Sequence, residues 1–270
     1  MQFMGERIAN NYLKTGAALT LFILIITLAG IFFLPGDYNA IDSDSRFLPP
    51  GKNHLMGTDN FGRNVFYRIM AGAKYTLLTA LVTVAGSALI GSVLGMFSGF
   101  AGGLLDEVVI RLLDVLSSFP GILLALLMVS LLDNSPQTLV AALLILFIPS
   151  FTRIMRNGML RYKTRDFVLS ARVAGISYPR IIFAHIFPNL WPSLLSTSVL
   201  GLSNAILAES TMSYLGLGIQ PPIPSWGRML AESQTFLFNA PWCALVPGLM
   251  IMLTVLAFHY LGEGLKEQAL

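Results

Sequence analysis

Charged residues are scarce in this sequence of 270 residues: they make up 11% of it, against about 25% in an average soluble domain. Hydrophobic residues make up 55%, and the mean hydropathy is +0.71. This composition excludes a water-soluble globular domain and a long disordered protein, so much of the apolar surface must face lipid. The net charge of +3 suits an anionic membrane surface better than a nucleic acid, so we expect no nucleic-acid partner.

Residue patterns of catalytic chemistry are also missing. The single cysteine, Cys243, allows no internal disulfide and identifies no redox compartment. No H-E-x-x-H, G-x-S-x-G or G-x-x-x-x-G-K-[ST] pattern occurs. The three histidines, His54, His185 and His259, are far apart, and His259 is more typical of an interhelical hydrogen bond than of a metal ligand. We therefore expect a chain that is not an enzyme and that binds no metal or cofactor itself.

Long, largely uncharged runs are abundant. About 20 apolar helical residues cross about 30 Å of hydrocarbon, whereas strands of membrane barrels alternate over about ten residues. The first run exceeds the apolar core of about 7–15 residues in a secretory signal, so it is expected to be an uncleaved anchor. The sequence predicts an all-α integral membrane protein with six transmembrane helices, at 15–34, 75–99, 112–132, 134–152, 186–208 and 241–262.

Basic residues predict the orientation of these helices. The connection between the fourth and fifth runs has one acidic residue, Asp166, and the basic residues Arg153, Arg156, Arg161, Lys163, Arg165, Arg172 and Arg180. The positive-inside rule places this connection in the cytoplasm, and six crossings then leave both termini there. The expected organisation is a cytoplasmic tail at 1–14, a first helix at 15–34, an extracytoplasmic segment at 35–74, and a five-helix domain at 75–270 with a cytoplasmic loop at about 161–189.

Small residues recur every four positions in the second run. Ser87, Gly91, Gly95 and Gly99 follow this spacing, and Gly103 extends it. Such a stripe lets another helix backbone approach closely in lipid, so we expect a helix-packing face. The alternative is glycine scattered through an apolar helix, where it is common.

The third run contains Pro120, which predicts a kink because proline lacks the backbone N–H and clashes with the preceding turn. The kink either lines a pathway or serves packing alone. Near the start of this run, Glu107 with Arg111, and Arg111 with Asp114, are spaced to pair on a solvated helix end. Glu209, which closes the fifth run, is interpreted as an interfacial residue rather than a gating one.

The segment 164–189 reads TRDFVLSARVAGISYPRIIFAHIFPN. A short amphipathic helix is expected to begin at Thr164 or Asp166 and to end between residues 175 and 179. Its apolar stripe is expected to consist of Phe167, Ala171 and Ala174. Such a helix either lies in the groove of a partner protein or rests on lipid headgroups.

Gly175, followed thirteen residues later by Pro188, resembles the cytoplasmic EAA loop of ABC-importer permeases. The sequence has Leu-Ser-Ala at 169–171 where that loop prefers Glu-Ala-Ala, and His-Ile-Phe at 185–187 where Ile-x-Leu is usual. In this family a coupling helix in the loop docks into the ATP-binding subunit. The resemblance implies docking residues in the positions Arg165, Asp166, Ala171, Arg172, Gly175, Tyr178 and Pro188.

Two further segments resemble the dipeptide, oligopeptide and nickel branch of these permeases. HLMGTDNFGRNVFYR at 54–68 is similar to the signature H-x-L-G-T-D-x-x-G-R-D-x-x-S-R and keeps His54, Gly57, Thr58, Asp59, Gly62, Arg63 and Arg68. SYLGLGIQPPIPSWGRML at 213–230 is similar to the segment between the fifth and sixth spans, with candidate residues Gly216, Gly218, Pro221, Pro222, Trp226 and Gly227. The ring of Trp226 is expected at the outer membrane interface.

The resemblance implies the "C-type" permease subunit of an ABC importer in a prokaryotic inner or plasma membrane. Its implied partners are a homologous permease, two ATP-binding subunits that hold ATP and Mg, an extracytoplasmic solute-binding protein, and membrane lipid. Together the permeases would pass peptides, nickel or chelated metals by alternating access. The sequence Ala-Ile-Asp at 40–42, with Ser45 and Arg46, favours nickel slightly. The alternatives are a secondary transporter or channel without ATPase subunits, and an intramembrane enzyme.

Overall fold

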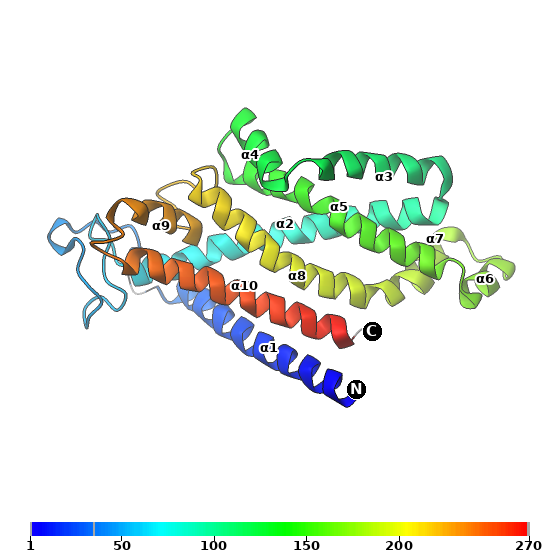
Figure 1. The fold of residues 1–270 in the computed structure, drawn as a ribbon, viewed down its shortest axis with the longest axis horizontal. Helices are drawn as coiled ribbons and strands as arrows, with labels where there is room; N and C mark the ends of the chain where they lie inside the picture. The colour runs from blue at the N-terminus through cyan, green and yellow to red at the C-terminus, as the bar shows by residue number, and fades with distance from the viewer. Residues whose placement is uncertain (1, 35, 269–270) are drawn as a thin grey trace.

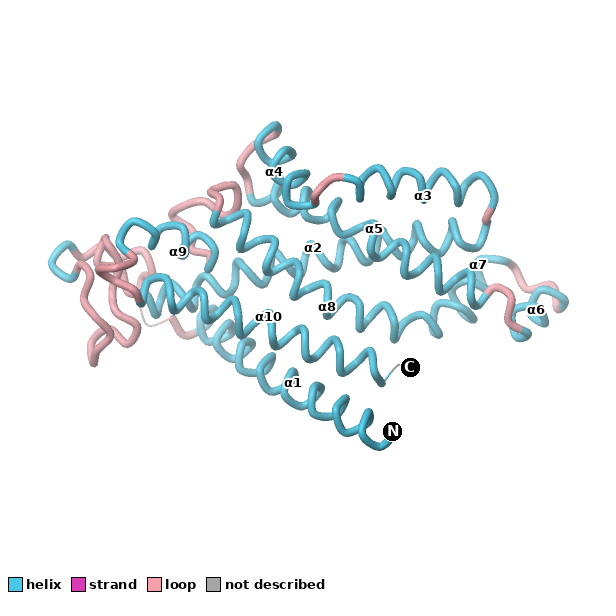
Figure 2. The backbone as a smooth tube through the Cα atoms, in the orientation of Figure 1, coloured by secondary structure: helices cyan, strands magenta, loops and turns pink. Residues whose placement is uncertain are grey.

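The computed structural model describes residues 2–34 and 36–268, and this part of the chain forms an elongated bundle of helices (Figure 1). Its regular structure is helical, and its one β-bridge joins Thr58 to Asn64 (Figure 2). Five helical stretches are long and apolar enough to cross a membrane. They are α1 (Gln2–Phe32), α2 (Val65–Ala101), α5 (Pro136–Tyr162), Tyr178–Tyr214, which ends in α8 (Phe187–Tyr214), and α10 (Trp242–Gln268).

The two ends of the bundle differ. At one end lie the long segment between α1 and α2, which includes the short helix η1 (Ser43–Ser45), and the helix α9 (Trp226–Ser233) with η3 (Gln234–Phe236). At the other end lie α6 (Asp166–Val173) and α7 (Tyr178–Arg180), and the N- and C-terminal ends of the chain point the same way (Figure 1). We call these the α9 end and the α6 end.

The predicted third span is a broken helix. Helix α3 (Gly103–Ser118) and helix α4 (Gly121–Leu131) meet at 86°, so the bundle has six spans only if this pair counts as one. Phe119 adopts an extended conformation because a residue before proline is pushed out of the helical region, and Pro120 supplies no N–H to continue the helix. The kink predicted at Pro120 is therefore a complete break in the helix.

Helix α2 starts earlier than the expected Tyr75. Asn64 caps it at the N-terminus by accepting a hydrogen bond of 3.0 Å from the amide of Phe66. Helix α5 likewise continues past Thr152 to Tyr162. Hydrophobic runs mark the lipid-crossing part of a helix, and capped or charged turns extend it beyond the lipid.

The most extensive helix contact joins α2 to α5 along the small residues Gly91, Gly95 and Gly99. A Cβ atom at Gly91 would lie 2.6 Å from the Cβ of Phe151, and one at Gly99 would lie 2.9 Å from the carbonyl oxygen of Arg156. At the first position of the predicted stripe, the hydroxyl of Ser87 donates a hydrogen bond to the carbonyl of Leu144, at 2.9 Å. The two backbones are therefore in direct contact.

Gly103 does not extend this stripe. It has a positive φ of 59°, and nothing lies within 4 Å of a Cβ built on it. The chain reverses at Gly102 and Gly103 to start α3, which takes Gly103 away from α5.

Ion pairs hold α3 against α5. Arg156 donates two hydrogen bonds to the carboxylate of Asp106, at 2.5 and 2.6 Å, and Arg153 donates one to Asp114 at 2.9 Å. The predicted pair between Glu107 and Arg111 forms on the exposed face of α3. The predicted pair between Arg111 and Asp114 is wrong, because Asp114 binds Arg153 of the neighbouring helix. This part of the chain is a helix–helix contact and not merely a solvated helix end.

Candidate functional site

Helix α6 projects from the bundle on a small apolar anchor. Val168 and Ala171 are buried in a core cluster with Ile181 and Ile182. The rest of α6 is exposed and mixed in character: Leu169 is 45% exposed and Val173 is 90% exposed, beside the exposed polar residues Asp166, Ser170 and Arg172. The helix therefore presents apolar side chains to a surface that this chain itself does not cover.

The predicted apolar stripe of this segment is only partly correct. The helix begins at Asp166, as expected, and Ala171 is buried, but Phe167 is 41% exposed and Ala174 is exposed as well. The buried pair is instead Val168 and Ala171, whose spacing of i, i+3 places both side chains on one face of the helix.

Gly175 ends α6 in a Schellman motif. Its φ is +73°, its amide donates to the carbonyl of Arg172 at 3.0 Å, and the amide of Ile176 donates to the carbonyl of Ala171 at 3.1 Å. Nothing lies within 4 Å of a Cβ placed here, so the backbone conformation, and not crowding, is what requires glycine.

Arg172 and Tyr178 connect α6 to the end of α2. The guanidinium carbon of Arg172 lies 5.2 Å from the ring centre of Phe100 and 6.0 Å from that of Tyr178, and the two rings lie 5.4 Å apart. These cation–π and aromatic contacts fix α6 relative to the bundle. Arg165 and Asp166, which open α6, are both exposed.

A π-helical turn, η2 (Ile181–Ile186), lies between α7 and α8. Pro188 stands just inside α8 and cannot donate a backbone hydrogen bond to the turn before it. The side chain of Asn189 instead donates to the carbonyl of His185, at 2.7 Å. The residues of the EAA-like spacing thus form one continuous unit from α6 to the first turn of α8.

At the opposite end, the segment 54–68 carries an ion-pair cluster. The carboxylate of Asp59 accepts a hydrogen bond from Nε of Arg63 at 2.6 Å and lies 3.9 Å from Nε of Arg68. Both arginines also bind Glu232 of α9, each at 3.1 Å, and Arg228 approaches Glu232 at 3.4 Å. Arg68 is only 2% exposed. The cluster therefore joins the start of α2 to α9 in a largely buried position.

Two glycines shape this segment. Gly57 and Gly62 have φ values of +74° and +75°, and a Cβ at Gly57 would lie 2.7 Å from the carbonyl oxygen of Leu48. Thr58 between them accepts a hydrogen bond from the amide of Leu48 at 2.8 Å and donates one to the carbonyl of Ser45 at 2.5 Å. His54 lies 3.3 Å from the side-chain amide of Asn64.

Asp42 packs beside this turn. Hydrogen bonds from the hydroxyl of Ser45 and the amide of Asp44 hold the pKa of Asp42 below its usual value. A Cβ at Gly62 would collide with the carbonyl oxygen of Asp42. The segment 40–46 is therefore a capped turn packed against the segment 54–68.

The ring of Trp226, expected near the outer membrane interface, is enclosed by the protein and exposed to neither lipid nor water. The side chain is fully buried, and its indole N–H donates to the carbonyl of Ile69 of α2 at 3.0 Å. An indole that finds a partner for its N–H can be buried completely. Gly227 lets α9 lie directly on the backbone of Ser210.

The loop before α9 starts at a second Schellman motif. Gly216 has a φ of +82° and donates to the carbonyl of Ser213 at 3.2 Å, while Leu217 donates to Met212 at 2.9 Å. Gly218 packs against Ser213, whereas Pro221 and Pro222 are exposed at the tip of the loop.

Two acidic residues differ from what the sequence indicated. Glu209 is fully buried and accepts hydrogen bonds from the hydroxyls of Ser213 at 2.7 Å and Ser210 at 3.4 Å, so it is not an interfacial residue. Glu232, which binds three arginines, was not among the candidate residues. The available signal was its spacing of four residues from Arg228, on a short helix that begins within the segment 213–230.

No group of three or more potential metal ligands occurs in residues 2–34 and 36–268. His259, expected to bond between helices, is exposed on α10. Two features stand out in the described residues: a projecting helix with exposed Leu169 and Val173 at the α6 end, and a largely buried ion-pair cluster at the α9 end.

Residues 91–266 match the family described as binding-protein-dependent transport system inner membrane component. Because this match spans more than half of the sequence, the chain belongs to that family. Its membership confirms the resemblance to ABC-importer permeases and makes the chain a multi-pass protein of a prokaryotic plasma membrane.

Individual relatives cover nearly the whole chain. The dipeptide transport system permease protein DppC of Alkalihalophilus pseudofirmus is 37% identical over 249 residues, which span 92% of this chain and 82% of the relative. The protein of the same name from Haemophilus influenzae is 38% identical over 256 residues, or 92% and 87% of the two chains. The glutathione transport system permease protein GsiD of Pectobacterium atrosepticum is 35% identical over 264 residues, or 97% and 88%. The chain is thus a permease of the ABC-importer branch to which these relatives belong.

Proposed function

We propose that this chain pairs with a homologous permease to form a path for small peptides, which two ATP-binding subunits open and close. The α6 end and both termini face the cytoplasm, and the α9 end faces outward toward a solute-binding protein. The excess of basic residues between α5 and α8 supports this orientation. In this arrangement the chain binds no ATP or Mg, which belong to the partner subunits.

The ATPase contact is supported by one observation: α6 is anchored through Val168 and Ala171 and leaves Leu169 and Val173 exposed among polar residues. An isolated surface helix normally exposes polar residues, whereas Leu169 and Val173 stay uncovered here. The contacts of Arg172 with Phe100 and Tyr178 connect α6 to α2, so a displacement of α6 would be transmitted to the membrane-spanning helices. A helix held in the groove of an ATPase subunit accounts for both features.

The relatives support peptides as the substrate class. These relatives are named as dipeptide, glutathione and oligopeptide transport permeases. The segment 40–46, which favoured nickel in the sequence, forms a turn capped by Asp42 and needs no metal to explain it. We therefore place peptides before nickel.

The docking claim is tested by Val173→Asp in the complete transporter, reconstituted with its partner permease, ATPase subunits and binding protein. Because Val173 is 90% exposed, the variant should fold and insert normally. We expect ATP-dependent uptake to fall by about tenfold or more, since burial of an unpaired carboxylate costs more than the about 1.4 kcal/mol that corresponds to a tenfold change in affinity.

The matched control is Phe238→Asp, which places the same charge at a residue 98% exposed at the α9 end. It should leave ATPase attachment unchanged. Co-purification of the ATPase subunits measures docking separately from uptake. Normal uptake and attachment in Val173→Asp would exclude α6 as the docking helix.

A further inference from the structure

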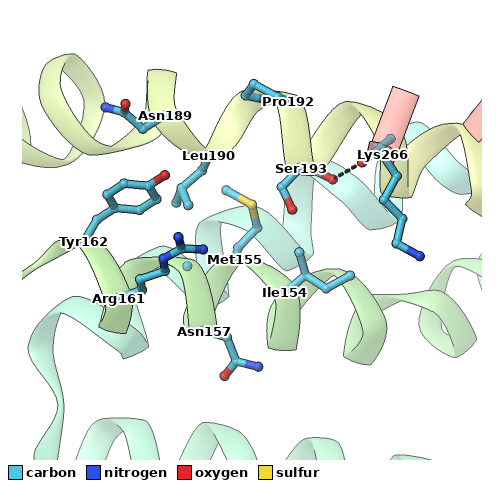
Figure 3. Close-up of a pocket in the computed structure, with 12 residues that line it drawn as sticks. Ile154, Met155, Asn157, Arg161, Tyr162, Asn189, Leu190, Pro192, Ser193 and Lys266 are labelled. Atoms are coloured by element: carbon cyan, nitrogen blue, oxygen red, sulfur yellow. Dashed lines mark hydrogen bonds between the residues drawn. The ribbon is translucent and has the colours of Figure 1, made fainter. Parts of the chain in front are cut away.

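A cavity of about 390 Å³ opens between α5, α8 and α10 near the α6 end (Figure 3). Its floor is apolar and includes Met155 and Leu190, both of which are buried. Its rim is polar and basic. The rim residues come from the last turns of α5 and α10 and the first turns of α8, and they are Asn157, Arg161, Tyr162, Asn189, Ser193 and Lys266.

The charge of this rim is predominantly positive. Arg161 is exposed, stacks beside Tyr162 with 5.8 Å between the guanidinium carbon and the ring centre, and makes no ion pair among the side chains that the structure describes. Lys266, on the other side of the opening, lies 3.4 Å from Glu263 and is 53% exposed. Figure 3 shows Arg161 and Lys266 on opposite sides of the opening, carried by α5 and α10. The rim thus offers one free guanidinium, one partly neutralised ammonium and several hydrogen-bond donors.

Two residues that line the cavity lie near the ends of uncharged runs. Lys266 follows the uncharged run 241–262 by about one helical turn, and Asn189 stands close to the start of the run 186–208. An apolar floor beneath a basic rim at this position matches the two parts of a phospholipid. Basic pockets between transmembrane helices are known to receive anionic lipid headgroups.

We propose that this cavity binds one anionic phospholipid, with its headgroup at the rim that carries Arg161 and Lys266 and an acyl chain against Met155 and Leu190. Charge complementarity selects the anionic headgroup, and the apolar floor selects a lipid over a free anion. A bound lipid would brace α5 and α8 against α10. This proposal does not depend on the substrate or on the ATPase contact.

The test uses the complete transporter in nanodiscs of phosphatidylcholine containing a trace of spin-labelled phosphatidylglycerol. The motionally restricted fraction of the label reports bound lipid. The double variant Arg161→Gln, Lys266→Gln should lose one restricted phosphatidylglycerol per transporter. The matched control is Lys52→Gln, Arg111→Gln, which removes one lysine and one arginine charge from exposed positions that do not line the cavity and should keep that lipid.

Three results would overturn the proposal. Equal loss in both double variants would show a general attraction of charge. An unchanged fraction in the cavity variant would show an empty or partner-covered cavity. Displacement of the label by millimolar inorganic phosphate, but not by unlabelled phosphatidylglycerol, would show a site for a free anion.

Discussion

At the scale of single residues, Asp59 organises the α9 end. Its carboxylate accepts hydrogen bonds from the amides of Phe61 and Arg63, as well as from the guanidinium of Arg63. Without its charge, three arginines would share the single carboxylate of Glu232. The loss of one partner from a buried ion-pair network is costly because the remaining charges stay desolvated.

The variant Asp59→Asn tests this residue. We expect it to destabilise the permease by about 3 kcal/mol, within the range for breaking a buried pair, and to lower the thermal unfolding temperature of the assembled transporter. The control Glu107→Gln removes a carboxylate of the exposed pair with Arg111, which is worth about 0–1 kcal/mol. Equal unfolding temperatures for the two variants would show that the cluster contributes no more than a surface pair.

Sequence reasoning found most of this cluster but not all of it. Asp59, Arg63 and Arg68 lie within one motif, so their proximity follows from spacing alone. Glu232 is separated from them by four spans, and only the packing of α9 on α2 brings it within 3.1 Å of Arg63 and Arg68. The same packing buries Trp226, which composition alone assigns to an interface. Long-range contacts of this kind leave no local pattern in the sequence.

At the scale of helices, hydrophobic runs predict where the chain crosses the membrane but not how it bends. The runs that became α1, α2, α5, α8 and α10 carry a strong signal, because lipid requires long apolar helices. The break between α3 and α4 has two causes. One is local, Pro120, and the other is the ion pair between Asp106 of α3 and Arg156 of α5. The ion pair joins distant parts of the chain, so it could not be read from the sequence.

The contact of α2 with α5 gives the next prediction. Gly95→Leu would push a branched side chain into the backbone of Thr152, so the helices must separate. We expect a cost of about 1–3 kcal/mol or more, seen as a lower unfolding temperature and a smaller yield of folded permease in the membrane. The control Ala85→Leu places the same side chain on an exposed position of α2. A normal yield for Gly95→Leu would mean that α2 and α5 can move apart without penalty.

At the scale of the whole molecule, both ends of the bundle are rigid and the spans connect them. The aromatic contacts of Arg172 join α6 to α2, and the cluster around Asp59 joins α2 to α9. Helix α2 therefore extends from one proposed docking surface to the other. A single long helix anchored at both ends favours rigid-body movement over local unfolding as the way to alternate access.

This arrangement predicts that the chain cannot transport by itself. Proteoliposomes that contain the permease pair and the binding protein, but no ATPase subunits, should take up labelled dipeptide only at the background rate, because no ligand then favours one global state over the other. Addition of the ATPase subunits with ATP and Mg should restore uptake. Excess unlabelled dipeptide should compete with the label, whereas nickel ions should not.

Vesicles with inactive ATPase subunits serve as the matched control, since they keep the complex assembled. Full uptake without ATPase subunits would identify a secondary transporter, and uptake of labelled nickel in place of dipeptide would assign the chain to the metal-transporting members of its branch.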